Sequence, residues 1–286
     1  MVYIPDGKIV KYKKFIPPPL VAGDIAYWDG SAVQLVSKTK WNASLGTPVG
    51  VVVIPSNMLP DGRARILTLK GVDSSGNAVD SLVGMTWGIR GTETVLTNYD
   101  RVPTTDNSSN INNGSGDWGK LPSDNFSLDQ SFVDPKAKYA GGNVDDPLIA
   151  SPYLGDDNTL NPAYYEAISG YNNALSDFNG LSNTQTLVSL GSNYVAANAA
   201  WKYKDGVSNL QWYLPAMGEL GFMIVRRKEI NNTLSMLGAI SLPTNYVWSS
   251  SEYSAYETWG PIIGSGKVDG TRKDYNAVHV RPFALI

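Results

Sequence analysis

Histidine and cysteine carry out much of the acid–base, nucleophilic and metal chemistry of enzymes, and this chain has almost none of either. Its 286 residues contain no cysteine, and His279 is the only histidine. Without cysteine the chain can form no thiolate nucleophile, no disulfide and no Cys-ligated zinc or iron–sulfur site. With one histidine it cannot build a metal site of two or three histidines, and a Ser–His–Asp triad would have to use His279. Most familiar catalytic sets are therefore excluded.

The sequence around His279 favours a non-catalytic role for this residue. It lies in Ala277–Phe283, whose alternating pattern is typical of a strand. The alternation places His279 on the face opposite Val278 and Val280. We therefore interpret it as a surface or binding histidine rather than a catalytic base.

Carboxylates are the remaining candidates for metal or acid–base chemistry. Asp145-Asp146 and Asp156-Asp157 are paired acids, but neither pair has the alternating Asp-x-Asp-x-Asn-Gly pattern of a calcium loop. Glu219 has apolar neighbours, and we expect it to cap or brace a nearby loop, with Arg281 as a candidate partner. A glycosidase needs two facing carboxylates, and nothing in the sequence pairs any two of them. We therefore predict no metal, no cofactor and no enzymatic activity.

Charge and hydropathy exclude two further classes of partner. Only 17% of residues are charged, compared with about 25% in an average soluble domain, and the net charge is −3. The chain has no basic run that could grip a phosphate backbone, so nucleic acid is not an expected partner. No apolar run approaches the ~18 residues of a membrane helix, and the first residues, MVYIPDGKIVKYKKF, lack the apolar core of a signal peptide. We expect neither membrane insertion nor Sec export.

The first 72 residues are predicted to form a small all-β unit. Asp29-Gly30 and Asp61-Gly62 are dipeptides typical of hairpin turns. Thr47–Pro55 is a continuous β-branched run, as expected for a strand that is covered on both faces. This spacing of strands and turns suggests a compact barrel or sandwich. The predicted strands are Val21–Trp28, Ala32–Val36, Thr47–Pro55 and Ala64–Leu69.

The rest of the chain is predicted to be a larger α+β domain. Gly71–Asp80 has turn composition and is the predicted junction between an N-terminal anchoring or assembly domain, 1–72, and a second domain, 73–286. Loop insertions are expected at about 100–170, because residues 106–119 are rich in Asn, Ser and Gly. The predicted elements are a helical segment from Asn183 that is interrupted at Gly191, a helix from about Pro215 to Ile230 with Arg226–Lys228 near its C-terminal end, and strands Tyr246–Ser249 and Ala277–Phe283.

Four stretches of the C-terminal part resemble one protein family. They are Asp177–Leu187 (DFNGLSNTQTL), Gln211–Leu220 (QWYLPAMGEL), Val247–Tyr253 (VWSSSEY) and Val280–Ile286 (VRPFALI). In this order and spacing they resemble bacterial and phage C-type-lectin-fold domains. The nearer similarity is to the C-terminal type of the Legionella collagen-like protein and to variable proteins of diversity-generating retroelements in gut Bacteroides phages and prophages.

The resemblance implies a fold and a mode of binding. The fold would be two helices against a twisted antiparallel sheet, with Trp212 and Trp248 of the motifs as core aromatics whose indole N–H groups are satisfied internally. The segment between the Trp-Ser-Ser strand and the terminal strand would form an exposed binding face, diversified by adenine mutation, chiefly at Asn codons. Phage members of the family hold a host-surface receptor there. The EPN and WND signatures of calcium-dependent sugar binding are absent from this chain.

Residues 252–280 have a composition that suits such a face. The stretch contains four glycines and Pro261 together with Tyr, Trp, Ser and Asn, as paratopes do. An ordinary polar surface loop with a few inward aromatics is the alternative interpretation. The family pattern implies that Trp259, Gly264 and Lys273 are scaffold residues. The residues predicted to face the ligand are Tyr256, Thr258, Ile262, Asp269, Thr271, Arg272, Asp274, Tyr275, Asn276 and His279.

Together these observations predict a non-enzymatic ligand- or receptor-binding protein. It would be a phage or prophage virion protein of a tail tip or fibre that presents its diversified face to a bacterial cell-surface protein or glycan. The N-terminal unit would contact other virion proteins, and a homo-oligomer such as a trimer suits a symmetric fibre. The protein would be made in the bacterial cytoplasm and reach the outside in the virion. Two alternatives stay open: a structural virion subunit without a ligand, for decoration or tail assembly, and a carbohydrate-active enzyme on a lectin-like scaffold.

Overall fold

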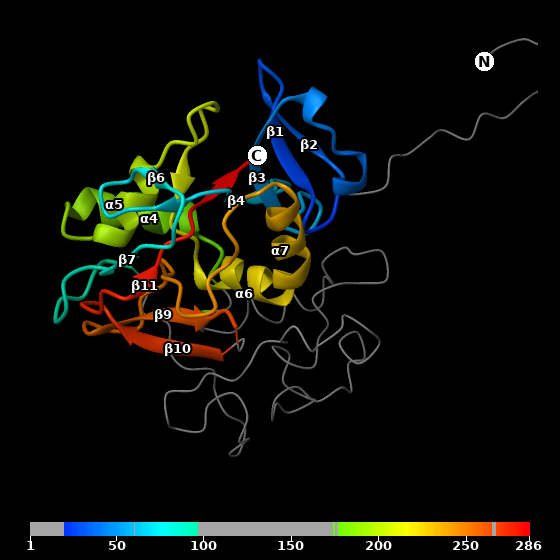
Figure 1. Cartoon of the computed structure of the whole chain (residues 1–286). Helices are drawn as coiled ribbons and strands as arrows, with labels where there is room; N and C mark the ends of the chain where they lie inside the picture. Colours follow the sequence, from blue (N-terminus) through cyan, green and yellow to red (C-terminus); the bar gives the residue numbers. More distant parts are fainter. Residues whose placement is uncertain (1–19, 60, 97–173, 175–176, 265–266) are drawn as a thin grey trace, which may run out of the picture.

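A computed structural model describes residues 20–59, 61–96, 174, 177–264 and 267–286. These residues form a mixed structure of helices and strands around a six-stranded antiparallel sheet with the order β2-β1-β3-β4-β12-β8 (Figure 1). The predicted α+β class is thereby confirmed at this coarse level. The strands of the sheet are β1 (Ile25–Trp28), β2 (Val33–Val36), β3 (Thr47–Ile54), β4 (Arg65–Thr68), β8 (Trp212–Tyr213) and β12 (Phe283–Leu285).

The central strand β3 is covered on both faces, as its β-branched sequence predicts. Its last six residues are buried, and they divide between two hydrophobic cores. Val51 and Val53 belong to the core that contains helices α6 (Met217–Val225) and α7 (Arg227–Met236). Val49 and Val52 belong to the core on the other face. Successive strand side chains point to opposite faces, so Val51, Val52 and Val53 supply the two cores in turn. Val49 lies where the register of β3 against β1 shifts, so it does not follow this alternation.

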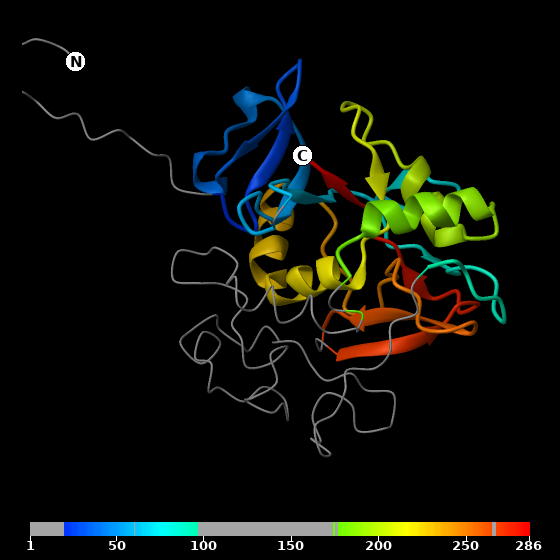
Figure 2. The ribbon, with the colours of Figure 1, turned by 180° about the vertical axis from the view of Figure 1, so that it is seen from behind.

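The second core is built against a different pair of helices, α4 (Gly180–Leu190) and α5 (Val195–Lys202), which Figure 2 shows from behind. Their separation at Gly191, which has φ 126°, confirms the predicted interruption, although α4 begins three residues before Asn183. The single helix predicted from Pro215 to Ile230 is instead two helices that meet at Arg226. The basic cluster Arg226–Lys228 lies at this junction: Arg226 is the C-terminal cap of α6, and α7 begins at Arg227.

Three two-stranded ladders complete the described structure. The predicted strand Tyr246–Ser249 forms only isolated bridges, of Tyr246 with Ile262 and of Val247 with His279. The predicted strand Ala277–Phe283 is divided into β11 and β12, which are separated in sequence by Pro282. The ladders pair β5 (Gly71–Val72) with β6 (Ala78–Val79), β7 (Gly84–Met85) with β11 (Val278–His279), and β9 (Glu257–Ile262) with β10 (Lys267–Arg272).

The sheet joins the beginning of the described chain to its end. Strand β12 lies between β4 and β8, with Phe283 opposite both Leu67 and Tyr213. A boundary at residue 72 therefore does not separate two sheets, and the predicted junction Gly71–Asp80 is a hairpin of β5 and β6 beside the common sheet. The predicted insertions at 100–170 and the paired acids within them lie outside the described residues. Within the described ranges no helix is long and apolar enough to cross a membrane.

The two motif tryptophans differ in one hydrogen bond. Trp248 and Trp212 are both fully buried, which confirms them as core residues. The Trp248 indole N–H donates to the Met85 carbonyl over 2.7 Å, as expected. For Trp212 the expectation of an internal partner was wrong, because its indole nitrogen has none among the described residues.

This difference provides a matched pair of substitutions. Trp248→Phe is expected to lower the free energy of unfolding by about 1–3 kcal/mol more than Trp212→Phe, because only the first leaves a buried carbonyl without its donor. Both substitutions remove a similar part of a buried ring, so the packing losses largely cancel. Urea denaturation followed by circular dichroism measures the difference, and equal losses would contradict the prediction.

Candidate functional site

The loop that follows β7 packs against the end of the β9–β10 hairpin. The backbone N–H of Trp87 donates to the Lys273 carbonyl over 2.9 Å, and the N–H of Gly91 donates to the Ala255 carbonyl over 2.8 Å. The N–H of Lys273 in turn donates to the Tyr256 carbonyl over 3.1 Å. Segments nearly two hundred residues apart in sequence are thus held together by backbone hydrogen bonds.

A buried ion pair lies under this junction. The Lys273 ammonium donates to the carboxylate of Glu252, and both side chains are fully buried. Lys273 also donates to the Thr92 carbonyl over 2.9 Å and lies 5.0 Å from the centre of the Trp87 ring. Glu252 accepts hydrogen bonds from the backbone N–H and hydroxyl of Thr94. Buried charges are tolerated only with such partners, so the pair fixes the loop and the hairpin to one another.

Five exposed side chains lie on the outside of the same junction. Arg272 forms a bidentate pair with Asp274, with distances of 3.0 and 2.8 Å. The Arg90 guanidinium lies 5.5 Å from the ring centre of Tyr256 and 4.0 Å from Asp274. Tyr256 and Tyr275 are 56% and 49% exposed, which is unusual for residues of their size. We call these five residues, Arg90, Tyr256, Arg272, Asp274 and Tyr275, the arginine–tyrosine face.

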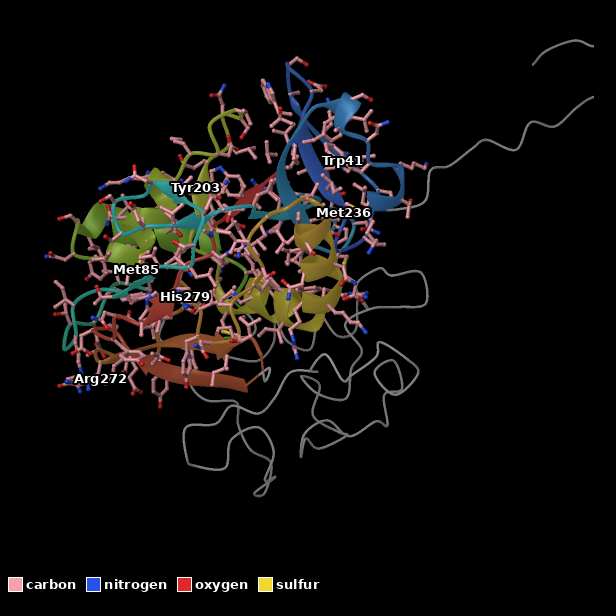
Figure 3. All side chains as sticks on the ribbon, viewed as in Figure 1. Trp41, Met85, Tyr203, Met236, Arg272 and His279 are labelled. Carbon is pink, nitrogen blue, oxygen red and sulfur yellow. The ribbon has the colours of Figure 1, made fainter. Side chains whose placement is uncertain are left out.

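The face combines an ionised carboxylate with guanidinium and phenol groups. Hydrogen bonds from Arg272 hold the pKa of Asp274 below its ordinary value, so this carboxylate stays ionised at neutral pH. Arginine and tyrosine are enriched among the residues that dominate binding energy at protein interfaces. Figure 3 shows Arg272 at the end of the β9–β10 hairpin, with His279 closer to the body of the molecule.

Two residues predicted to face the ligand are buried instead. Thr258 and Thr271 lie opposite each other in the β9–β10 ladder, with exposed fractions of 0% and 8%. Thr258 donates to the Ser251 carbonyl over 2.7 Å. The hairpin packs this face onto the rest of the protein, so the prediction was wrong for both threonines.

The other predicted residues are spread over a wider surface. Ile262 is partly buried at the end of β9 farthest from Tyr256, which is about 17–20 Å along a strand of six residues. The backbone of Asp269 lies in β10 opposite Gly260, and its side chain lies outside the description. Asn276 is exposed.

His279 has the alternation predicted for it. Val278 and Val280 on either side are buried, whereas His279 is partly exposed. Its backbone N–H donates to the Tyr246 carbonyl over 3.2 Å. Its Nδ1 is buried and has no partner among the described residues.

The three predicted scaffold residues occupy structural positions. Trp259 and Lys273 are at most 1% exposed. Gly264 is exposed, but a Cβ there would lie 2.9 Å from the Thr244 carbonyl, which leaves no room for a side chain without a shift. Arg90 in the face and Glu252 beneath it were not predicted from the sequence. A signal for Glu252 was present, because it follows the Trp-Ser-Ser motif and a scaffold lysine that is buried needs an acid.

A second cluster of charged side chains surrounds Glu219. This carboxylate is buried and accepts hydrogen bonds from the Tyr213 hydroxyl over 2.8 Å and the Ala216 N–H over 2.9 Å. Its ion-pair partner is Arg65 at 3.3 Å, so the prediction of bracing was right and the predicted partner Arg281 was wrong. Gly180 lies so close that a Cβ there would come within 2.2 Å of the carboxylate, which requires glycine as the first residue of α4.

The pKa of Glu219 gives this cluster a measurable pH dependence. Burial raises the pKa from 4.5 to about 7, against the opposing effects of Arg65, the Ala216 N–H and the Tyr213 hydroxyl. Between these two values the folded protein holds a proton that the unfolded chain has lost, so stability falls as the pH rises. The shift corresponds to about 3 kcal/mol.

Glu219→Gln is therefore expected to remove this part of the pH dependence. The free energy of unfolding of the native protein should fall by about 3 kcal/mol relative to that of the variant between pH 4.5 and pH 7.5. Urea denaturation of both proteins at several pH values measures the difference. Parallel pH profiles would show that Glu219 titrates alike in the folded and unfolded chains.

Within the described residues no group of three or more Asp, Glu and His side chains could hold a metal ion. Comparisons of the chain with protein-family models, with curated proteins and with solved structures find no match.

Proposed function

We propose that this chain is a non-enzymatic binding protein that presents the arginine–tyrosine face to a protein or glycan on a bacterial surface. The observation that carries the proposal is the construction of the face. Exposed Tyr256, Arg272 and Tyr275 lie above the fully buried pair of Lys273 and Glu252. A rigid support with large amphipathic side chains on its surface lowers the entropy that binding must overcome.

The sequence motifs support a more specific form of the proposal. The C-terminal part would have a C-type-lectin fold, and the segment around the hairpin would be diversified by a retroelement. The protein would belong to a phage or prophage virion, in a tail tip or fibre, as a homo-oligomer bound to other virion proteins. The four resembling stretches contribute structural residues, such as the buried Trp212, Trp248 and Glu252, which is what a fixed scaffold requires.

Binding to whole cells tests the first form of the proposal. The purified protein would be applied to a panel of Bacteroides strains, and Tyr256→Ala and Arg272→Ala are expected to weaken binding at least about thirtyfold, as hot-spot substitutions do. Met236→Ala, at an exposed residue of α7, and Lys70→Met, at an exposed cation, are the matched controls. Binding that all four variants leave unchanged would contradict the assignment of the face.

The DNA that flanks the gene tests the retroelement. We expect a nearby reverse transcriptase and a second copy of the codons for residues 250–286 whose mismatches are confined to adenines. Absence of both, together with loss of binding in the face variants, would leave a binding protein without diversification. Absence of both without cell binding would favour a structural virion subunit.

A further inference from the structure

A pocket lies beside the Glu219 cluster, away from the arginine–tyrosine face. It has a volume of about 320 Å³, at the lower end of the range of about 300–1,000 Å³ for small-ligand sites. The residues that line it belong to the turn before β4 and the start of β4, the residues before α4 and its first turns, and parts of β8, α6 and β12. None of these elements contributes a residue to the arginine–tyrosine face.

The charged residues that line the pocket are two arginines, Arg63 and Arg65, and two acids, Asp61 and Glu219. Arg63 and Arg65 both bind Asp61, at 3.3 and 2.7 Å. Burial raises the pKa of Asp61, but hydrogen bonds from the two arginines outweigh that effect and hold the pKa below 3.8. Asp61 is therefore ionised at neutral pH, and its carboxylate already binds two guanidinium groups.

Both arginines keep a donor for a ligand. Arg65 uses Nη1 for Asp61 and the Arg63 carbonyl, and it uses Nε for Glu219. In the described part of the chain, Arg65 Nη2 and Arg63 Nη1 have no hydrogen-bond partner. Arg65 is only 5% exposed, so its guanidinium is held in place by its partners, whereas the Arg63 side chain is 53% exposed and can adjust.

The lining also contains apolar side chains. They are Leu59, Phe178, Leu181 and Leu285, and they lie among the polar residues Asn179, Ser182 and Gln185. The first turn of α4, which includes Leu181, contains no acidic residue of its own, but two carboxylates already lie at its start: Asp177 accepts from the Asn179 N–H over 3.0 Å, and Glu219 lies against Gly180. The pocket thus combines guanidinium donors with apolar side chains.

We propose that this pocket binds a small organic carboxylate, with the carboxylate on Arg63 and Arg65 and the apolar part against Phe178 and Leu181. A planar guanidinium matches a carboxylate in charge and geometry. The apolar side chains of the lining favour an organic acid over an inorganic anion, because only the organic acid has an apolar part that they can contact. A neutral sugar would leave the free guanidinium donors without a charged acceptor.

Glu219 adds a pH dependence to this site. It faces Arg65 and Tyr213, and the negative charge of Asp177 also acts on it. Below pH 7 a neutral Glu219 leaves two guanidinium groups against Asp61 alone, whereas above pH 7 the charges balance. A bound carboxylate should therefore be held several-fold more tightly at pH 6 than at pH 8.

Calorimetric titration of the full chain with benzoate tests the proposal, with benzamide, inorganic phosphate and methyl glucoside as comparisons. Benzoate is expected to bind at least roughly tenfold more tightly than each of the other three, since a charge-assisted pair is the main difference from benzamide. Arg63→Met should weaken benzoate binding at least about fivefold, whereas Lys70→Met, at an exposed cation outside the pocket, should leave it unchanged.

The remaining outcomes overturn the proposal in identifiable ways. Equal binding of benzoate and benzamide, or unchanged benzoate binding in Arg63→Met, would remove the carboxylate site. Preference for methyl glucoside would assign the pocket to sugars, and preference for phosphate would assign it to inorganic anions. A benzoate affinity that rises from pH 6 to pH 8 would contradict the role of Glu219. None of these results depends on binding at the arginine–tyrosine face.

Discussion

Lys273→Met is expected to lower the free energy of unfolding by about 3–5 kcal/mol, because it leaves the Glu252 carboxylate buried without its cation. The substitution also removes the donor to the Thr92 carbonyl and the contact with the Trp87 ring. Urea denaturation measures the loss. Lys70→Met is the control, since this ion pair with Asp80 is exposed and should contribute less than about 1 kcal/mol.

A double substitution separates the ion pair from general packing. Glu252→Gln combined with Lys273→Met removes both charges, so the double variant should lose less stability than the sum of the two single losses. The difference measures the coupling of the pair. Strictly additive losses would show that Lys273 stabilises the fold by its volume and not through its charge. The buried ion pair could then not be what holds the arginine–tyrosine face rigid.

The buried pair of Lys273 and Glu252 and the exposed pair of Arg272 and Asp274 should differ in how much they stabilise the fold. This difference would allow the face to vary in sequence. The exposed pair is 58% and 41% accessible and is screened by solvent, so its loss should change the stability little. Stability is therefore concentrated under the surface, whereas the residues available for recognition lie on it. A scaffold of this kind tolerates substitution at Tyr256, Arg272 and Tyr275 without unfolding.

Local sequence patterns were enough to predict β3, the hairpin of β1 and β2, and the end of α4. The β-branched run of β3 and the turn at Asp29-Gly30 gave the right strands, and Gly191 gave the right helix end. The break at Arg226 was missed because the apolar pattern continues across it and neither proline nor glycine marks it. Propensity alone cannot distinguish one bent helix from two.

Long-range contacts explain most of what the sequence could not predict. Glu219 and Arg65 are 154 positions apart, and nothing local in the sequence selects Arg65 over Arg281 as the partner. Strand alternation could place Thr258 and Thr271 on a common face of the hairpin, but it could not say that this face is buried. The arginine–tyrosine face likewise depends on Arg90, from a loop far from residues 252–280.

Arg281 provides the test of whether the described chain is one folding unit. Its guanidinium is fully buried, and it donates to the carbonyls of Thr68, Ile240 and Ser241 at 2.9, 3.2 and 2.9 Å. Burial lowers its pKa to about 10, so it is still charged at neutral pH. One side chain from the C-terminal segment thus ties the end of β4 to the loop after α7.

Arg281→Met is expected to lower the free energy of unfolding by about 2–4 kcal/mol, since the buried Thr68 carbonyl and the less buried carbonyls of Ile240 and Ser241 lose their donor while the volume is nearly kept. Because β12 is hydrogen-bonded between β4 and β8, the loss should appear in a single unfolding transition, seen alike by tryptophan fluorescence and circular dichroism. Two separate transitions, of which only one shifts, would indicate that the N-terminal domain predicted from the sequence unfolds independently. A single shifted transition means that the surface bearing the arginine–tyrosine face and the strands before residue 72 are stabilised together.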